Sequence, residues 1–361
     1  MRPEWIDQPT AVRPGEELDV GTLAAYLRRH LPDISEPIQL QQFPSGYSNL
    51  TYLLRIGEKE FVLRRPPFGA HTIRAGHDMK REYRTLVGLS KVYGKVPRPL
   101  LYCEDESVIG APFYIMERVK GVILRTVPPA GLDLRPDVAQ KLSQSFVDNL
   151  VEIHAVDYQA AGLADLGRPQ GYVQRQIRGW SERYAAARTD DIPEMERVRD
   201  WLETHRPPDS GAALIHNDYK YDNLVLDPTD LSRIVAVLDW EMATIGDPLM
   251  DLGSTLGYWV QADDPEELQQ FRFCPTTLPG NFTRAEIVSR YAERSHRDVS
   301  DILFYYVYAL FKIAVIVQQI YFRYYRGFTR DERFARMIHL VRILAAMAVK
   351  AIERGRIDRL G

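Results

Sequence analysis

One stretch of the chain, residues 214–252, restricts the fold and the chemistry more than any other. Asp218 and Asn223 lie on a polar loop between two apolar runs, and Asp239 ends the next run of strand-forming residues. Carboxylate and amide oxygens are hard ligands of the kind that Mg²⁺ prefers, usually together with phosphate oxygens. An acid, an amide and a second acid at the ends of strands therefore predict a site for metal and phosphate.

The size and composition are those of a soluble enzyme. A chain of 361 residues is long enough for two lobes, because single cores stop growing at about 250 to 300 residues. Apolar residues make up 45% of the chain and charged residues 26%, with a net charge of -3. These values are ordinary for a globular protein and give no reason to expect a nucleic-acid partner.

The cysteine content and the first residues indicate a location inside the cell. Cys103 and Cys274 are the only cysteines, too few for a disulfide framework or a cysteine-based zinc site. Residues 1–7 lack the apolar core of a signal peptide and carry no lipidation pattern. We therefore expect a cytoplasmic protein.

One apolar run, residues 302–322, is about as long as a membrane span. Lys312 and two glutamines interrupt the run, and Arg323 follows it at once. We therefore expect no membrane partner, and we predict a helix buried inside a helical lobe.

The apolar pattern after residue 38 has a period of two, which predicts antiparallel strands. The expected strands cover residues 38–43, 50–56, 61–64, 100–104 and 112–118. A turn of four residues, 57–60, joins the second strand to the third. Residues 1–20 hold three prolines among charges, which predicts a mobile or draped arm, and residues 21–31 form an amphipathic helix.

Helices dominate the chain after Gly121. Helical spacing of apolar residues predicts one helix before this point, over residues 78–89, and helices over residues 136–155, 172–187 and 195–203 after it. We expect His154, near the end of the second of these, to cap or pack rather than to take part in catalysis. Residues 162–171 are expected to form a loop.

The side chains of the 214–252 stretch resemble the catalytic and metal loops of the protein-kinase-like fold. The triplets His216–Asp218 and Asp239–Glu241 stand in the places of His-Arg-Asp and Asp-Phe-Gly, with Asn223 between them. In this form the chain is similar to the aminoglycoside phosphotransferase and choline kinase-like family, and to the kinase-like domain that accompanies acyl-CoA dehydrogenases.

This resemblance covers about residues 36–350 and implies an α+β, two-lobe fold. The expected division is an arm over residues 1–35, a β-rich N-lobe over residues 36–117 and a mainly helical C-lobe over residues 118–361. The implied cofactors are ATP or GTP with magnesium.

In the C-lobe the resemblance assigns roles to five residues. Asp218 would accept a hydrogen bond from the attacking hydroxyl and orient it toward the γ-phosphate. The alternative for Asp218 is a turn aspartate that bonds its own backbone. Asn223 and Asp239 would hold Mg²⁺, while His216 and Asp251 would organise the loop.

In the N-lobe Arg64 stands where the kinase pattern has a phosphate-pairing lysine, and Glu82 stands where a helix glutamate pairs with that lysine. Arginine keeps the positive charge but differs from lysine in reach and geometry. Arg65 is the alternative phosphate ligand; it would point to the opposite face of the strand. Glu241 replaces the glycine of the protein-kinase triplet.

Four further residues are nucleotide-binding candidates by resemblance. Ser48 and Asn49 lie in the turn that would cover the phosphates, although an ordinary hairpin turn explains them equally well. Backbone groups near Glu117 and Val119 would bond adenine. The alternative is a buried strand followed by a glycine turn.

The acceptor is expected to be a small molecule with a hydroxyl group and a negative charge. Residues 321–361 contain ten Lys or Arg against four Asp or Glu. Together with the resemblance to dehydrogenase-associated domains, this excess of positive charge favours a hydroxyacyl-CoA or a hydroxy acid. Residues 305–325 could line a pocket for its acyl chain. Two alternatives stay open: a kinase of aminoglycoside antibiotics, and a catalytically silent pseudokinase that binds nucleotide, or a scaffold. The sequence does not predict the oligomeric state.

Overall fold

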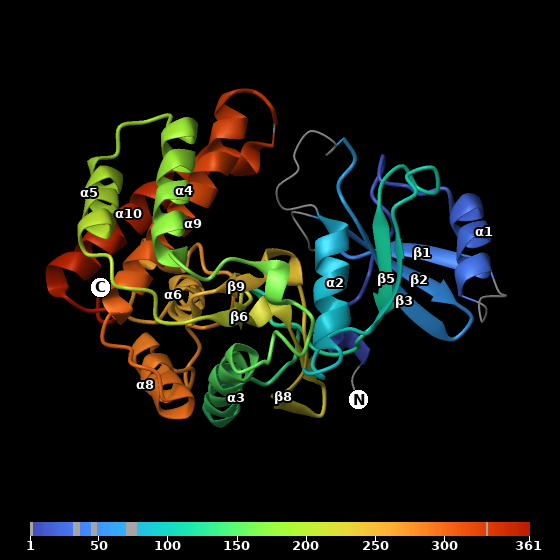
Figure 1. Cartoon of the computed structure of the whole chain (residues 1–361), viewed down its shortest axis with the longest axis horizontal. Coiled ribbons are helices and arrows are strands. Elements are labelled where there is room, and N and C mark those ends of the chain that lie inside the picture. Colours follow the sequence, from blue (N-terminus) through green and yellow to red (C-terminus); the bar gives the residue numbers. More distant parts are fainter. Residues whose placement is uncertain (1–2, 32–36, 45–48, 70–77, 330) are drawn as a thin grey trace. The chain divides into compact units, whose positions relative to one another are not determined.

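The computed structural model describes residues 3–31, 37–44, 49–69, 78–329 and 331–361. It divides into two compact units that interleave along the chain (Figure 1). Unit 1 comprises residues 1–123, 157–163 and 224–243, and unit 2 comprises residues 124–156, 164–223 and 244–361. The single lobe boundary expected at residue 117 stays a prediction.

Unit 1 is built on a five-stranded antiparallel sheet with strand order β1-β2-β3-β5-β4. The strands are β1 (Ile38–Gln42), β2 (Leu50–Ile56), β3 (Lys59–Arg65), β4 (Pro99–Cys103) and β5 (Phe113–Glu117). Ile56 pairs directly with Lys59, so the turn between β2 and β3 has two residues and the predicted four-residue turn is wrong. Gly57 has a φ of 58°, which suits so tight a turn.

The sheet separates two helices that cover its opposite faces (Figure 1). Helix α1 (Val20–His30) packs Leu23 and Leu27 on the face that carries Leu63 and Ile115, which are paired across β3 and β5. The other face carries Arg64, paired with Tyr114, and meets α2 (Met79–Leu89). Alternation along β3 therefore sends Arg64 toward α2 and its neighbours toward α1.

The N-terminal arm is draped over unit 1. It begins with the 3₁₀ helix η1 (Pro3–Trp5). Thr10 forms a bridge with Gln42 of β1, and the Asp7 N–H donates to the carbonyl of Gly121 at 3.2 Å. Backbone bonds to two separate parts of unit 1 hold the arm in place.

Unit 1 ends with a hairpin from the middle of the chain. Strands β7 (Leu224–Asp227) and β8 (Asp230–Val237) pair antiparallel, with Asp227 opposite Asp230 at the turn, and the 3₁₀ helix η5 (Trp240–Met242) follows. Leu226 bonds Val122, and a Cβ at Gly121 would collide with the Leu226 carbonyl. Glycine is therefore needed where the two backbones approach.

Unit 2 is mainly helical. Its helices are α3 (Pro136–His154), α4 (Tyr172–Ala187), α5 (Pro193–Thr204), α6 (Pro248–Tyr258), α7 (Glu266–Gln269), α8 (Arg284–Ser295), α9 (Ile302–Tyr325) and α10 (Met337–Arg354). Short strands β6 (Ala213–Ile215) and β9 (Thr244–Gly246) pair antiparallel, and 3₁₀ helices η3 (Ala164–Leu166), η4 (Tyr221–Asn223) and η6 (Glu332–Arg336) lie between the helices. The predicted helices agree closely with α2 to α5, whereas the predicted loop over residues 162–171 contains η3.

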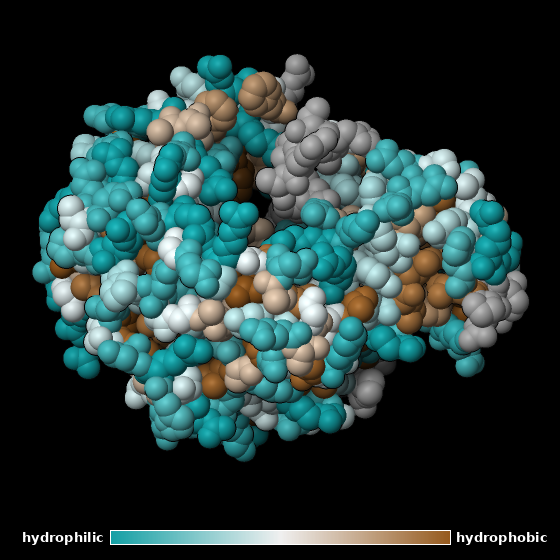
Figure 2. All heavy atoms as spheres, viewed as in Figure 1, coloured by the Kyte–Doolittle hydropathy of each residue, from teal (hydrophilic) through white to brown (hydrophobic). Residues whose placement is uncertain are grey.

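Helix α9 forms the core of unit 2. It is long and apolar enough to cross a membrane, but 78% of its most apolar window is buried in the structure. Helices α4, α6 and α10 pack against it. The face of the molecule in Figure 2 is mostly hydrophilic, with scattered hydrophobic patches. This arrangement agrees with the expected buried helix, and the antiparallel sheet with many helices is the predicted α+β class.

Candidate active site

The Asp218 loop follows strand β6 in unit 2 and ends in η4. The Oδ2 atom of Asp218 accepts hydrogen bonds from Lys220 Nζ at 2.7 Å and from Asn223 Nδ2 at 2.9 Å. Asn223 Nδ2 also donates to the Asp218 carbonyl at 2.8 Å. Two side chains of the loop therefore orient the carboxylate, which differs from a turn aspartate that bonds its own backbone.

Lys220 links two carboxylates of the loop. Its Nζ lies 3.2 Å from Asp222 Oδ1 in addition to the bond with Asp218. Burial lowers the pKa of Lys220, but the two carboxylates outweigh burial and hold that pKa above its usual range. Burial raises the pKa of Asp222, which Lys220 opposes. Lys220 was not predicted from the sequence, although its place two residues after Asp218 on the same loop was a usable signal.

The backbone of the Asp218 loop is anchored by Asp251 of α6, which is fully buried. Its two oxygens accept the backbone N–H groups of His216 and Asn217, each at 2.7 Å. His154 Nε2 lies 3.1 Å from Asp251 Oδ2, and His154 Nδ1 lies 2.7 Å from the Tyr291 hydroxyl. Burial would raise the pKa of Asp251, but the contacts with both histidines hold it below its usual value. Asp251 and His154 thus have the supporting roles that were predicted.

A second cluster of charged side chains surrounds Arg64 in unit 1. Arg64 Nη1 bonds Glu82 Oε1 at 2.5 Å, and Nη2 bonds Asp239 Oδ1 at 2.9 Å. Arg64 Nη2 also lies 3.5 Å from Glu241 Oε2, an oxygen that accepts a bond from Asn49 Nδ2. The predicted ion pair between Arg64 and Glu82 is present, and Asp239 and Asn49 lie in the same cluster.

Burial governs the electrostatics of this cluster. Arg64 is 8% exposed and Glu82 is 1% exposed. Burial raises the pKa of Glu82 to about 7, with Arg64 opposing the shift. Burial alone would lower the pKa of Arg64, but Glu82 and the other acids hold it well above its usual range. Among the atoms described, Arg64 Nε is a buried donor without a hydrogen-bond partner, a state that buried donors rarely keep.

Arg65 lies on the opposite face of the sheet from this cluster. Its Nη1 donates to the Ile109 carbonyl at 2.8 Å, and its guanidinium lies 3.8 Å from the Phe68 ring centroid. Arg65 is thus a buried packing residue, and Arg64 is the arginine that faces the acids.

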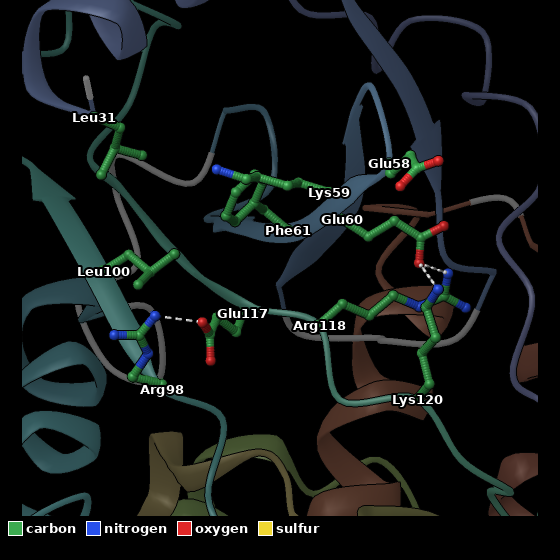
Figure 3. Close-up of a pocket in the computed structure, with 10 residues that line it drawn as sticks. All are labelled: Leu31, Glu58, Lys59, Glu60, Phe61, Arg98, Leu100, Glu117, Arg118 and Lys120. Carbon is green, nitrogen blue, oxygen red and sulfur yellow. Dashed lines mark hydrogen bonds and ion pairs between the residues drawn. The ribbon is translucent and has the colours of Figure 1, made fainter. Parts of the chain in front are cut away.

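Three of the nucleotide-binding candidates are not seen in the Arg64 cluster. Ser48 lies outside the described residues. The side chain of Glu117 points to the α1 face of the sheet and pairs with Arg98 (Figure 3). It lines a pocket of about 530 Å³ there, and its backbone N–H bonds the Arg98 carbonyl. Val119 packs beside the small core of Ile123, Val225 and Ala236. Adenine binding near residues 117–119 stays a prediction.

The two predicted metal ligands belong to different units, Asn223 to unit 2 and Asp239 to unit 1. That they share one ion stays a prediction. Across the described part of the chain, no group of three or more His, Cys, Asp or Glu could hold a metal. Asn223 uses Nδ2 for its bonds, which leaves its amide oxygen as a ligand, and Asp239 is partly exposed. An amide oxygen and a carboxylate fit Mg²⁺, which usually takes one or two protein oxygens together with phosphate oxygens and waters.

Comparison with known proteins identifies the family. Residues 39–273 match the family described as "Phosphotransferase enzyme family". The crystal structure of a candidate aminoglycoside phosphotransferase from Ralstonia eutropha is 32% identical, with a TM-score of 0.76, and the match covers 92% of this chain and 99% of that one. Acyl-CoA dehydrogenase family member 11 of Rattus norvegicus is 33% identical over 362 residues, which cover 95% of this chain and 44% of that protein. The chain thus spans less than half of that relative.

Two solved structures share the fold at lower identity. Choline kinase from Cryptosporidium parvum is 14% identical with a TM-score of 0.62, over 95% of this chain and 98% of that one. An ADP-bound aminoglycoside phosphotransferase is 17% identical with a TM-score of 0.56, over 92% and 99%. Both show the fold alone, which is kinase-like as predicted. With more than half of its length matched by the family, the chain belongs to the phosphotransferase enzyme family.

Proposed function

We propose that this protein transfers the γ-phosphoryl group of ATP or GTP to a hydroxyl group of a small molecule, with magnesium as cofactor. The observation that carries the proposal is the orientation of Asp218. Lys220 and Asn223 hold its carboxylate at one oxygen. Asp251 fixes the backbone before it. An oriented carboxylate on an anchored loop is what a phosphotransferase needs to position an attacking hydroxyl.

Asp218 acts on the acceptor in this proposal. Its carboxylate accepts the hydrogen bond of the acceptor hydroxyl and takes the proton as the oxygen attacks phosphorus. Lys220 keeps a positive charge beside it, which compensates negative charge that develops on the transferring group.

The Arg64 cluster holds the nucleotide phosphates. Arg64 offers its buried, unpartnered Nε and its charge to a phosphate oxygen, and Glu82 fixes the guanidinium. Asn49 and Ser48 supply further donors, and backbone groups near Glu117 and Val119 bind the base. Asp239 and the amide oxygen of Asn223 would hold Mg²⁺, which neutralises phosphate charge when bound.

For the acceptor we propose an anionic molecule, either a hydroxyacyl-CoA or a hydroxy acid. Arg323, Arg326 and Arg336 are exposed near the end of α9 and in η6, beside Phe328, which is 71% exposed. The similarity to an acyl-CoA dehydrogenase family member supports an acyl substrate. The side chains from Tyr305 to Val315 are buried in the core of unit 2, and so are Val317 and Gln318. Only the part of α9 after Gln318 is therefore available to line an acyl pocket.

Two other functions are weighed against this one. The name of the similar Ralstonia structure favours an aminoglycoside kinase. A silent pseudokinase is favoured by Arg64, which replaces the usual lysine and already pairs with Asp239. For the enzyme we propose a cytoplasmic location, where its two buried free cysteines stay reduced.

Thermal unfolding with and without Mg-ATP tests nucleotide binding first. A ligand at 100 times its dissociation constant should stabilise the protein by about 2.7 kcal/mol. Asp239→Ala should lose the magnesium-dependent part of this stabilisation and keep the magnesium-independent part. Absence of stabilisation by Mg-ATP and by Mg-GTP would refute both kinase functions and a pseudokinase that binds nucleotide.

A labelling screen with γ-labelled ATP then identifies the acceptor class. The panel contains hydroxyacyl-CoAs, hydroxy acids and aminoglycosides. We expect label on an anionic hydroxy compound. Preferred labelling of aminoglycosides would overturn the anionic acceptor, and nucleotide binding without any labelled product or ATP hydrolysis would support the pseudokinase.

A further inference from the structure

Helix α9 contains one charged residue between Ile302 and Phe322, and that residue is Lys312. Lys312 is only 4% exposed and lies among apolar neighbours of the unit 2 core. Moving an ammonium group out of water is unfavourable unless hydrogen-bond partners in the protein replace the water. A lysine at this place therefore calls for an explanation in its contacts.

The contacts of Lys312 lead to the catalytic loop. Its Nζ donates to the backbone carbonyl of Asn217 at 3.0 Å and lies 3.3 Å from Ser254 Oγ. Burial lowers the pKa of Lys312, while the charges of Asp218 and Asp251 favour its protonated form. The buried cation thus lies beneath the peptide that joins Asn217 to Asp218.

Asn217 has a backbone conformation that needs support. Its φ is 67°, in the left-handed region, which asparagine enters more readily than most residues other than glycine but which is still uncommon. Asp251 Oδ1 accepts its N–H at 2.7 Å, and its side-chain Nδ2 lies 3.4 Å from the Tyr172 hydroxyl. Lys312 binds the remaining main-chain group, the carbonyl. Asp251 and Lys312 together clamp the peptides on both sides of the Asn217 Cα atom.

We propose that Lys312 is a positioning residue for phosphoryl transfer, because its ammonium group holds the Asn217–Asp218 peptide in the orientation from which the Asp218 carboxylate reaches the acceptor. The inference rests on the proposed function, since the step that it serves is the one assigned to Asp218. Lys312 acts through the backbone and not on the substrate. The orientation of a peptide plane sets the direction of the next side chain, so a small rotation at Asn217 displaces the Asp218 carboxylate.

The same helix supplies a matched control in Gln318. Gln318 is 1% exposed. Its Nε2 donates to the Ala187 carbonyl and to Thr189 Oγ1, both at 2.9 Å. Like Lys312, it is a buried polar residue of α9 that donates a hydrogen bond to a backbone carbonyl. The carbonyl that Gln318 bonds, that of Ala187, lies outside the catalytic loop. Replacing either residue by methionine removes a buried polar contact, so both variants should lose stability.

Steady-state kinetics of Mg-ATP turnover, with water or an identified acceptor, separates positioning from packing. Lys312→Met should lower kcat about 100-fold, the size of effect that a displacement of about 1 Å produces, with the KM for ATP unchanged. Lys312→Gln, whose amide can still donate to the Asn217 carbonyl, should recover part of the loss. Gln318→Met should keep the wild-type kcat. Equal kcat in Lys312→Met and wild type overturns the inference.

Hydrogen exchange provides a readout that is independent of turnover. Lys312→Met should speed exchange of the amides in residues 214–223, and Gln318→Met should not. Should Lys312→Met not fold, Lys312→Gln carries both measurements. Identical exchange in the lysine variants and wild type overturns the inference. Failure of the proposed function appears differently, as a wild-type protein that neither binds nor turns over Mg-ATP.

Discussion

The Arg64 cluster and the Asp218 loop both place carboxylates around a cation, but the loop has a second set of supports that the Arg64 cluster is not seen to have among the described contacts. In the Arg64 cluster, the side chains proposed to meet the nucleotide bond one another directly, Arg64 to Glu82 and to Asp239. In the Asp218 loop, Lys220 and Asn223 bond the functional carboxylate in the same direct way. Asp251 and Lys312 in addition bond the main chain behind it. A ligand of the first cluster competes with ion pairs already present, whereas the second is oriented before substrate arrives.

The largest expected effect comes from the loop. Asp218→Asn should lower turnover about 10²- to 10⁴-fold and leave the affinity for Mg-ATP nearly unchanged, because the phosphate-binding side chains of unit 1 are intact. Asp222→Asn is the matched control, since Asp222 pairs with the same Lys220 Nζ at 3.2 Å. Steady-state kinetics and calorimetric titration with Mg-ATP measure the two quantities. An equal loss of kcat in both variants would show that the loop needs only the charge balance around Lys220.

Much of both regions could be predicted because their partners are close in the chain or follow a local pattern. The period of two in β3 placed Arg64 and Arg65 on opposite faces, and the structure has them so. The helical spacing of residues 78–89 predicted the helix that carries Glu82, and the resemblance to the kinase pattern implied its ion pair with Arg64, which the structure contains.

The supports of the loop depend on tertiary packing, which local pattern does not encode. Lys312 is separated from Asn217 by 95 positions, so the sequence shows it only as a break in an apolar run. Glu241 likewise appeared only as a replaced glycine, although it bonds Asn49, 192 positions away. The turn after Ile56 was mispredicted because charged residues at 58–60 resemble a turn, while Lys59 and Glu60 belong to β3.

The second effect tests the direct ion pairs of the Arg64 cluster. In Arg64→Lys a single ammonium cannot bridge Glu82 and Asp239 as the planar guanidinium does. Losing one hydrogen bond between charged groups should lower the unfolding free energy by about 1.5–3 kcal/mol. Without the Nε donor, affinity for Mg-ATP should fall roughly tenfold, about 1.4 kcal/mol.

Arg65→Lys is the control for this prediction, since Arg65 is the more deeply buried of the two arginines but lies on the α1 face. Urea denaturation should show that it also destabilises unit 1, while titration with Mg-ATP should show wild-type affinity. If both variants lose affinity equally, the loss comes from the fold of the sheet, and Arg64 is not the phosphate ligand.

The smallest effect is a pH dependence whose sign differs between the two regions. Burial raises the pKa of Glu82 to about 7, above its ordinary value of 4.5. The folded state therefore binds the proton more tightly, and the contribution of Glu82 to stability is complete below pH 4.5 and lost as the pH rises to about 7. The pKa of Asp251 is shifted down, so its contribution is lost as the pH falls through that lowered value.

Glu82→Gln removes the titration and keeps an amide oxygen that can accept from Arg64. Between pH 5 and pH 7.5 the unfolding free energy of wild type should decline relative to this variant, by at most about 1.4 kcal/mol for each pH unit. Urea denaturation of both proteins at several pH values measures the difference. If the unfolding free energy of wild type instead rises relative to Glu82→Gln as the pH rises, the ion pair with Arg64 outweighs burial. The pKa of Glu82 would then be shifted down, as that of Asp251 is.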